Sequence, residues 1–314
     1  MAILLAMTEW DVKPWIERLE QQMPEEKFYT SDLYFPVEEI MYAVVWKHPS
    51  GILKNLPNVK AIFSLGAGVD NILQDTNLPD CPIVRAVDPD LTNRISEYIV
   101  LHCLRYLRQT KHYENLQRQI LWQDDPNQPA ARDVRVGVMG LGKLGADASS
   151  KLAMMGFQVA GWSRSQKSIK NIETYYGEDG LKEFLARTDI LVSLLPLTNE
   201  TTGILSMNLF QQLAQDGFLG GAALINAGRG ALQDEDDIIK ALDSKILIGA
   251  TLDVFNTEPL PKSSLLWKHP RVTITPHNAA LTSPDVVVKH IAHQIERVGT
   301  GMNFEHIINP DHGY

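Results

Sequence analysis

The amino-acid sequence predicts an α/β protein composed of two doubly wound parallel-sheet domains. Its 314 residues are enough for two domains of about 150 residues each. Short apolar, β-branched runs alternate with amphipathic stretches along most of the chain, which is typical of a parallel sheet flanked by helices. A glycine-rich turn follows one of these runs in the second half of the chain. An apolar fraction of 44% and a charged fraction of 21% exclude disordered, collagen-like and coiled-coil proteins.

The first hundred residues predict a small, open, flavodoxin-like sheet. The strand candidates are residues 3–6, 43–46, 61–65 and 83–86, and the gaps between them are mostly compatible with helices. A long amphipathic helix is then expected from Ser96, because apolar residues at positions 100, 103, 104 and 107 lie on one helical face. We expect this helix to pass Tyr113 towards Trp122 and to end before the polar, proline-containing segment 124–129.

The second half of the chain predicts another parallel sheet. Its strand candidates are residues 134–139, 157–162, 190–195, 222–226, 248–253 and 272–275. Ser206 and Asp234 are candidate N-caps of helices between these strands. A helix over residues 286–298 is expected to return the chain to the first domain. The predicted domains are therefore residues 1–98 together with 287–314, and residues 99–286.

The glycine-rich turn has the form GxGxxG and follows the strand at 134–139 directly. Gly140 permits a tight turn, Gly142 lets the backbone approach a pyrophosphate, and Gly145 lets the following helix pack closely. That helix has residues 144, 148, 152 and 155 on one face, and its N-terminus offers free N–H groups to phosphates. The cofactor-binding residues predicted here are Gly140, Leu141, Gly142, Lys143, Leu144 and Gly145.

The end of the next strand indicates which dinucleotide is bound. Proteins that bind NAD carry an acidic residue there, about 20 residues after the glycine turn, for the ribose hydroxyls. This chain has Ser163, Arg164, Ser165 and Lys167 instead. Arg164 can pair with a 2′-phosphate, which a carboxylate would repel. We therefore predict NADP(H), with NAD(H) less favoured; the alternative is a solvated basic loop.

Three later strands end in polar residues of the kind that bind and reduce an anionic carbonyl compound. Arg229 follows the strand at 222–226, Asp253 ends the next strand and precedes Glu258, and His277 follows the last strand. Ligands of open α/β sheets lie at the carboxyl ends of the strands. The simpler alternatives are a surface-turn arginine, a loop-capping glutamate and a structural histidine.

Charge and cysteine content restrict the partners and the compartment. Twenty-nine basic and 38 acidic residues give a net charge of −9, which argues against nucleic acid or an anionic membrane surface as a partner. Cys81 and Cys103 form no CxxC or Cys/His pattern, so we expect reduced thiols, a cytoplasmic protein and no zinc site. No apolar run approaches the roughly 20 residues of a membrane helix.

The chain resembles the D-isomer-specific 2-hydroxyacid dehydrogenases over essentially its whole length. The segments that carry the resemblance are residues 65–70, 140–145, 194–198, 226–230, 252–261 and 275–277. The resemblance implies a flavodoxin-like substrate-binding domain and a Rossmann NAD(P)-binding domain with a cleft between them. It also implies a homodimer built through the nucleotide domain and the long helix near residues 100–122.

The family likeness implies a catalytic set of Arg229, Glu258 and His277. His277 would donate a proton to the 2-oxo oxygen as hydride arrives from the nicotinamide, and a carboxylate such as Glu258 favours the protonated imidazole and holds the ring. Arg229 would bind the substrate's carboxylate or carbonyl oxygen. The implied substrate-binding residues are Trp46, Ala67, Gly68, Val69, Arg229 and His277. Further implied cofactor-binding residues are Leu195, Pro196, Thr198, Asn226, Ala227 and Asp253.

Two of these residues have plausible alternatives. Trp46 is either an apolar wall over the substrate or ordinary core, and Asp253 either contacts the nicotinamide carboxamide or caps a turn. The implied activity is NADPH-dependent reduction of small 2-oxo acids, such as glyoxylate and hydroxypyruvate, to 2-hydroxy acids. The alternatives are a reductase of bulkier 2-oxo acids such as phenylpyruvate, and a non-catalytic, dinucleotide-sensing protein similar to transcriptional corepressors.

Overall fold

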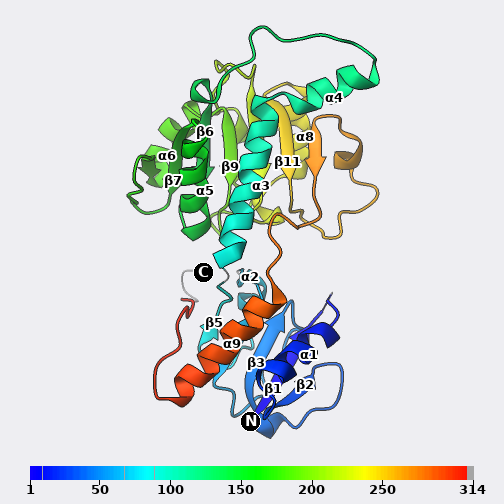
Figure 1. Cartoon of the computed structure of the whole chain (residues 1–314), viewed down its shortest axis with the longest axis vertical. Helices are drawn as coiled ribbons and strands as arrows, with labels where there is room; N and C mark the ends of the chain where they lie inside the picture. The colour runs from blue at the N-terminus through cyan, green and yellow to red at the C-terminus, as the bar shows by residue number, and fades with distance from the viewer. Residues whose placement is uncertain (9, 67, 88, 310–314) are drawn as a thin grey trace. The chain divides into compact units, whose positions relative to one another are not determined.

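The computed structural model describes residues 1–8, 10–66, 68–87 and 89–309, and the chain divides into two compact units (Figure 1). Unit 1 comprises Met1–Leu91 and Thr282–Tyr314, and unit 2 comprises Thr92–Leu281. Both divisions fall a few residues before the sequence-predicted boundaries at 98/99 and 286/287. The first one moves because Ile95 lies in the core of unit 2 and the Ser96 hydroxyl donates a 2.5 Å hydrogen bond to Asp147.

Unit 1 is built on a five-stranded parallel sheet with the order β2-β1-β3-β4-β5. This is the flavodoxin-like strand order, so the predicted architecture of the first domain is confirmed. The strands are β1 (Ala2–Met7), β2 (Lys27–Thr30), β3 (Ile40–Trp46), β4 (Ala61–Ser64) and β5 (Ile83–Val84). Strand β2 was not predicted, because it lies at the sheet edge and carries no continuous apolar run.

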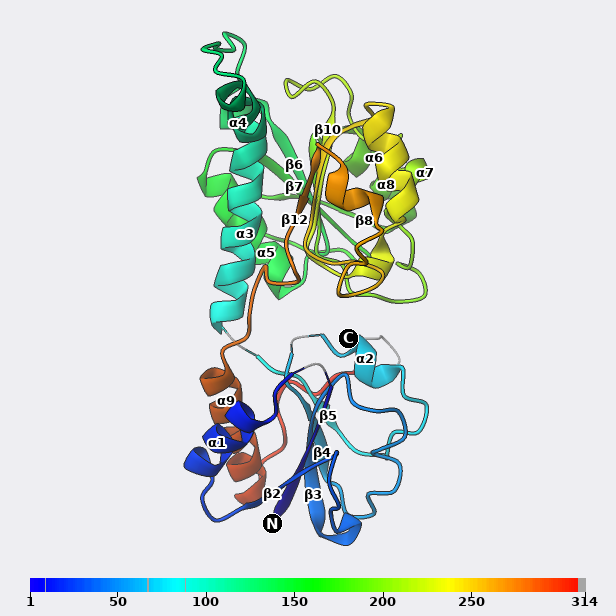
Figure 2. The same ribbon diagram turned by 90° about the vertical axis from the view of Figure 1, so that its right-hand side faces the viewer.

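Helices cover both faces of this sheet. Helices α1 (Lys13–Gln22) and α9 (Pro284–Gly299) pack against each other on one face, and α2 (Asp70–Leu73) lies on the other (Figure 2). Leu19 and Ile291 bury the first face, and Ile72 is buried against the second. The last helix therefore returns the chain to unit 1, as the sequence predicts.

Unit 2 is built on a seven-stranded parallel sheet with the order β12-β11-β10-β9-β6-β7-β8. Counted from β6, this is the Rossmann order 3-2-1-4-5-6 with one further strand, which confirms the predicted class. The strands are β6 (Arg135–Met139), β7 (Gln158–Ser163), β8 (Glu173–Tyr176), β9 (Ile190–Ser193), β10 (Ala222–Asn226), β11 (Leu247–Leu252) and β12 (Val272–Ile274). Strand β8 was not predicted, again because it is a polar edge strand.

Two helical layers sandwich this sheet (Figure 2). Helices α3 (Pro89–Leu107) and α5 (Lys143–Met154) lie on one face, and α6 (Gly177–Ala186), α7 (Met207–Phe210) and α8 (Glu235–Asp243) lie on the other. Ser206 and Asp234 are the N-caps of α7 and α8, and the Asp234 side chain accepts the Asp237 N–H. Across the described ranges, no helix has both the length and the apolar character needed to cross a membrane.

The prediction of one long helix from Ser96 towards Trp122 was wrong. Helix α3 begins earlier, at Pro89, and ends at Leu107, and a separate helix α4 follows at Thr110–Arg118. Gln109 between them has a φ of +51°, and its side chain donates a 2.6 Å hydrogen bond to Asp125. The left-handed residue breaks the helix where its apolar face ends.

Candidate active site

The polar strand ends singled out in the sequence lie along one edge of the unit 2 sheet. Strands β10, β11 and β12 are adjacent and parallel, with Asn226 paired to Leu252 and Leu252 paired to Ile274. Because the carboxyl ends of parallel strands share one edge, the loops that follow these strands meet there. The three loops carry Arg229, Glu258 and His277.

His277 and Glu258 form a hydrogen-bonded pair. The imidazole Nδ1 lies 2.7 Å from Glu258 Oε2, and the Phe255 N–H donates to Glu258 Oε1 at 3.0 Å. A carboxylate only accepts hydrogen bonds, so Nδ1 carries the proton in this pair and Nε2 is left for another partner. The His277 side chain is 39% exposed, so it is held in orientation while remaining accessible.

Asn226 and Gln233 build the turn that presents Arg229. Buried Asn226 donates from Nδ2 to the Arg229 carbonyl at 3.1 Å and to Gln233 Oε1 at 2.8 Å, and its Oδ1 accepts the Gly228 N–H. Gln233 then donates to the Val254 carbonyl at 2.9 Å. Asn226 was predicted to bind cofactor, and the structure shows it organising this turn. Gln233 was not anticipated, since a glutamine seven residues after the strand has no sequence signature.

Gly230 brings the Arg229 loop against the Glu258 loop. A Cβ atom at Gly230 would lie 1.9 Å from the carbonyl oxygen of Phe255 and 2.7 Å from the N atom of Asn256. No residue with a side chain fits at this position without moving one of the two backbones. Since Phe255 also donates to Glu258, the structure joins the loops of Arg229, Glu258 and His277 through successive contacts.

Asp253 caps the turn that follows β12. Its carboxylate is buried and accepts the Thr275 hydroxyl at 2.6 Å and the N–H groups of Asn278 and Ala279 at 3.0 and 2.9 Å. Its main-chain carbonyl accepts the His277 N–H at 2.8 Å. These bonds favour the turn-cap interpretation of Asp253 over a contact with the nicotinamide carboxamide.

The glycine turn fits a dinucleotide. Gly140 has a φ of +100°, and a Cβ at Gly145 would lie 1.9 Å from the Gly140 carbonyl oxygen, so both positions require glycine. Gly142, the N-cap of α5, has open space where its Cβ would be, which leaves room for a pyrophosphate at the helix N-terminus.

The other residues predicted on this turn and helix differ in exposure. Leu141 is buried against Gly161, whereas Lys143 is exposed and Leu144 is half-buried. Met155, expected on the buried face of α5, is 50% exposed.

The segment after β7 presents an exposed cation. The Arg164 side chain is 54% exposed, and its Nη1 lies 3.6 Å from Glu200 Oε2. Ser163 is buried and donates to the Ser165 carbonyl at 2.8 Å, whereas Ser165 and Lys167 are exposed. Glu200 was not anticipated as a neighbour of Arg164.

The loop after β9 contains three further residues predicted to bind the cofactor. Leu195 is buried, and Pro196 and Thr198 are half-buried. The Thr201 hydroxyl donates to the Pro196 carbonyl at 2.7 Å and accepts the Thr198 N–H at 2.8 Å, which fixes this loop. Ala227 donates from its N–H to the Ser193 carbonyl of β9, so its main chain belongs to the sheet edge.

In unit 1, Trp46 covers the predicted substrate-binding loop. A Cβ at Gly66 would lie 2.2 Å from the Trp46 ring, so the indole lies directly on the loop backbone. The Trp46 ring stacks on Trp10 with centroids 4.7 Å apart, and Trp10 stacks on Trp15 at 5.8 Å. Trp10 is 39% exposed, and no pattern in the sequence indicated this stack.

The Ser64 side chain at the end of β4 holds the same loop through hydrogen bonds to its main chain. Its buried hydroxyl lies 2.9 Å from the Gly66 carbonyl and 3.2 Å from the Gly68 carbonyl. Gly68 is half-buried, and Val69 has a buried side chain at the N-cap of α2. Ala67, predicted to bind substrate, lies outside the described residues.

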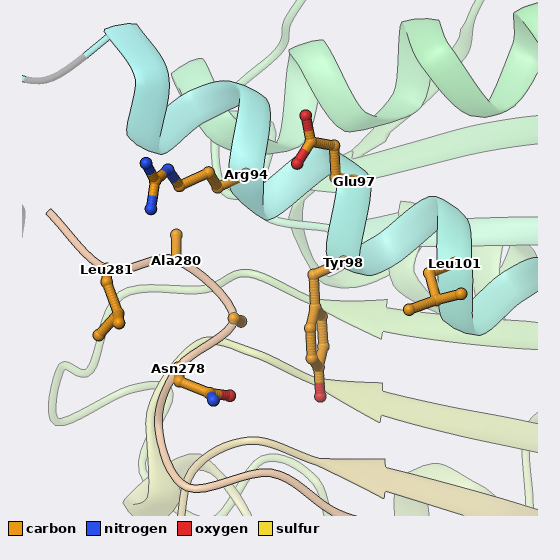
Figure 3. Close-up of a pocket in the computed structure, with 8 residues that line it drawn as sticks. Arg94, Glu97, Tyr98, Leu101, Asn278, Ala280 and Leu281 are labelled. Carbon is orange, nitrogen blue, oxygen red and sulfur yellow. The ribbon is translucent and has the colours of Figure 1, made fainter. Parts of the chain in front are cut away.

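A pocket of about 270 Å³ lies beside the turn that follows His277 (Figure 3). Helix α3 contributes one wall with Arg94, Glu97, Tyr98 and Leu101, and residues 278–281 form the other. The Tyr98 ring projects from α3 past Asn278 towards the strands. The sequence did not predict this pocket.

A Rossmann sheet with a glycine turn, and a histidine–carboxylate pair at its carboxyl edge, define an NAD(P)-dependent oxidoreductase. The family model described as D-isomer specific 2-hydroxyacid dehydrogenase, NAD binding domain, matches residues 100–279. The chain belongs to the D-isomer specific 2-hydroxyacid dehydrogenase family, and the resemblance noted in the sequence is confirmed.

The chain is similar to named members of the family over its full length. The chain is 38% identical over 323 residues to glyoxylate/hydroxypyruvate reductase A of Serratia proteamaculans, covering 100% of both proteins. Among solved structures, it is 43% identical to an NADPH-dependent glyoxylate/hydroxypyruvate reductase from Sinorhizobium meliloti in complex with NADP and sulfate. The TM-score is 0.94, over 100% of this chain and 99% of that one. A probable 2-hydroxyacid dehydrogenase from Rhizobium etli, in complex with NADP, HEPES and L(+)-tartaric acid, is 42% identical with a TM-score of 0.93, over 100% and 99%.

Proposed function

We propose that this chain is an NADPH-dependent reductase that converts small 2-oxo acids such as glyoxylate and hydroxypyruvate to 2-hydroxy acids. The observation that carries the proposal is the 2.7 Å His277–Glu258 pair beside the loop of Arg229. The names of the full-length relatives support the substrate class. The NADP complexes of similar structures and the cation at Arg164 support NADP(H), with NAD(H) less favoured.

The proposed reaction adds a hydride to the carbonyl carbon and a proton to its oxygen. When bound, the reduced nicotinamide supplies the hydride. His277 donates the proton from Nε2, while Glu258 holds Nδ1 and stabilises the charge of the imidazolium. Arg229 binds the anionic substrate and stabilises the oxygen as negative charge develops on it. The carbonyl group, the hydride and the proton together become the CH–OH group of the 2-hydroxy acid.

The remaining predicted contact residues are assigned by unit, to the substrate in unit 1 and to the cofactor in unit 2. We assign substrate contacts in unit 1 to Trp46 and to the loop of Ala67, Gly68 and Val69. Cofactor contacts fall on the main chain of residues 140–145, on residues 163–165 and 167, and on the loops that contain residues 195–198 and 226–227. We assign Asp253 to shaping the loop around His277 and not to a contact with the nicotinamide carboxamide.

The experiment that tests the function is a spectrophotometric panel of glyoxylate, hydroxypyruvate and phenylpyruvate with NADPH and NADH side by side. We expect NADPH oxidation with glyoxylate and hydroxypyruvate, and lower kcat/KM with phenylpyruvate. Preference for phenylpyruvate would instead indicate a reductase of bulkier acids. NADPH binding without oxidation of the coenzyme by any of the three acids would indicate a dinucleotide-sensing protein.

We also propose a cytoplasmic homodimer. Ile120, Leu121 and Trp122 are consecutive, apolar and 93%, 51% and 104% exposed, and such a cluster favours coverage by a second copy of the chain. Cys81 and Cys103 are free cysteines, which fits a reducing compartment. Sedimentation of the wild type and of Trp122→Asp would test the dimer: we expect the variant to be monomeric.

A further inference from the structure

We propose that Tyr98 is a positioning residue for His277, acting through the side chains of Thr275 and Asp253. The inference concerns a residue of α3 that precedes the glycine turn by some forty positions in the sequence. It rests on the proposed role of His277 as the proton donor.

The three side chains form a hydrogen-bonded chain with a fixed direction. Thr275 donates its single hydroxyl proton to Asp253 Oδ1 at 2.6 Å. Its oxygen is therefore free to accept only, and the Tyr98 hydroxyl, 2.8 Å away, is the donor. Tyr98 is 9% exposed, and burial raises its pKa, so the phenol keeps its proton. Figure 3 shows the ring extending from α3 with its hydroxyl pointing away from the helix.

The chain ends on the carboxylate that shapes the turn of His277. Asp253 accepts the N–H groups of the two residues that follow His277, at 3.0 and 2.9 Å, and its carbonyl accepts the His277 N–H. His277 itself has a φ of +51°, a conformation that residues other than glycine rarely adopt. The turn therefore depends on these bonds, and the orientation of the Asp253 carboxylate determines where the imidazole lies.

The same helix provides a matched control. Tyr106, two turns further along α3, also places its hydroxyl on a threonine, at 3.1 Å from Thr251. Thr251 lies within β11, whereas Thr275 adjoins the His277 turn. Burial also raises the pKa of Tyr106. Removing either hydroxyl deletes one partly buried hydrogen bond made by α3, but only the bond of Tyr98 leads to the His277 turn.

The experiment compares Tyr98→Phe, Tyr106→Phe, Thr275→Val and Thr275→Ser with glyoxylate and NADPH. We expect Tyr98→Phe and Thr275→Val to lower kcat about 10-fold, because small misplacements of a catalytic group are costly. The Kd of NADPH should stay within about twofold, since the glycine turn is untouched. Thr275→Ser keeps the hydroxyl and should recover most of kcat, and Tyr106→Phe should match the wild type. The double variant Tyr98→Phe/Thr275→Val should be no slower than Thr275→Val, because the chain is already broken.

A second measurement reports on the ring itself. The ¹⁵N resonances of the His277 imidazole should be equally sharp in the wild type and in Tyr106→Phe. In Tyr98→Phe they should be broader, because the turn samples more conformations. Equal losses of kcat in Tyr98→Phe and Tyr106→Phe, or additive losses in the double variant, would overturn the inference. If Tyr98→Phe does not fold, the Thr275→Val and Thr275→Ser pair tests the same chain. Wild-type kcat in Tyr98→Phe with an inactive His277→Ala overturns only this inference, whereas an active His277→Ala overturns the proposed function.

Discussion

The turn that carries His277 and the segments proposed to recognise ligands are built by different interactions. Around His277, a buried carboxylate accepts a hydroxyl and two N–H groups at 2.6–3.0 Å, and a second carboxylate holds the ring at 2.7 Å. Arg164 is instead a half-exposed side chain with a carboxylate at 3.6 Å, and Trp46 is held by ring stacking on a partly exposed Trp10.

The contrast follows from what each region must do. Proton transfer needs a donor within hydrogen-bond reach of one atom, so directional bonds to buried groups are useful there. Recognition of a phosphate or an apolar substrate group tolerates small displacements, so exposed cations and stacked rings suffice. Substitutions in the first region should therefore change turnover, and substitutions in the second should change preference between ligands.

The largest expected effect is that of His277→Ala. Loss of the proton donor should lower kcat on the order of 10² or more, with the Kd of NADPH nearly unchanged. Stopped-flow absorbance and NADPH fluorescence would measure the two quantities. His112→Ala, which removes an exposed histidine of α4, is the control. Turnover close to the wild type would show that the geometry of this turn serves stability and not catalysis.

Arg164→Asp should come next, with an effect on coenzyme preference. A carboxylate at this position would repel a 2′-phosphate and lose its charged hydrogen bond, so kcat/KM with NADPH should fall about 10-fold or more. With NADH it should change little. Lys170→Asp makes the same charge change at an exposed position six residues away and should preserve the ratio. An unaltered ratio in Arg164→Asp would place phosphate recognition elsewhere.

Trp10→Ala should have a smaller effect, on substrate preference. A stacked aromatic pair contributes about 1 kcal/mol beyond its buried area, so releasing Trp46 should raise the ratio of kcat/KM for phenylpyruvate over glyoxylate roughly fivefold. Trp10→Phe retains a ring for stacking and should keep the wild-type ratio. If both variants behave alike, the stack plays no part in substrate choice.

The smallest effect concerns acid stability near the Trp46 loop. Asp75 and His48 form a buried pair at 3.2 Å. Burial alone would raise the pKa of Asp75, but hydrogen bonds from the Gly51 and Asn77 N–H groups and from His48 together lower it. A lowered folded-state pKa gives stability that is present above the unfolded value of about 4 and lost as pH falls below it.

Asp75→Asn should therefore be less stable than the wild type at pH 6, and the gap should narrow as pH falls below about 4. Urea unfolding at the two pH values measures this difference. Turnover at neutral pH should stay within about twofold of the wild type, since Asp75 lies outside both recognition segments. If the difference in the free energy of unfolding between wild type and variant does not depend on pH, the ionised Asp75 carboxylate does not stabilise the fold.

The central parts of the fold were predictable because local sequence specifies them. Buried parallel strands are continuous apolar runs, Gly140 has a φ of +100°, and a Cβ at Gly145 would meet the Gly140 carbonyl oxygen, five residues away. The edge strands β2 and β8 escaped detection because partial exposure admits polar residues. The break in the long helix depends on Gln109 and its bond to Asp125, sixteen residues away, which no helical periodicity reveals.

The site was predictable only as far as strand ends identify it. Arg229, Glu258 and His277 could be named because each follows a strand in a polar, glycine- or proline-containing loop. The residues that position the site could not be named from the sequence. Gln233, Tyr98 and Trp10 act through partners 21, 177 and 36 positions away in the sequence. Only the folded chain determines which of many buried polar or aromatic residues meets them.

The contact between Trp46 and Gly66 has a consequence for redesign. Because the indole fills the space of any β-carbon at position 66, that position cannot be varied while Trp46 is present. A library that randomises position 46 alone is restricted to aromatic rings and smaller side chains that fit against the Gly66 backbone. A library that randomises position 66 alone should yield almost no folded members. Replacing Trp46 with a small residue first and then introducing alanine at position 66 would open combinations that variation of position 66 alone does not reach.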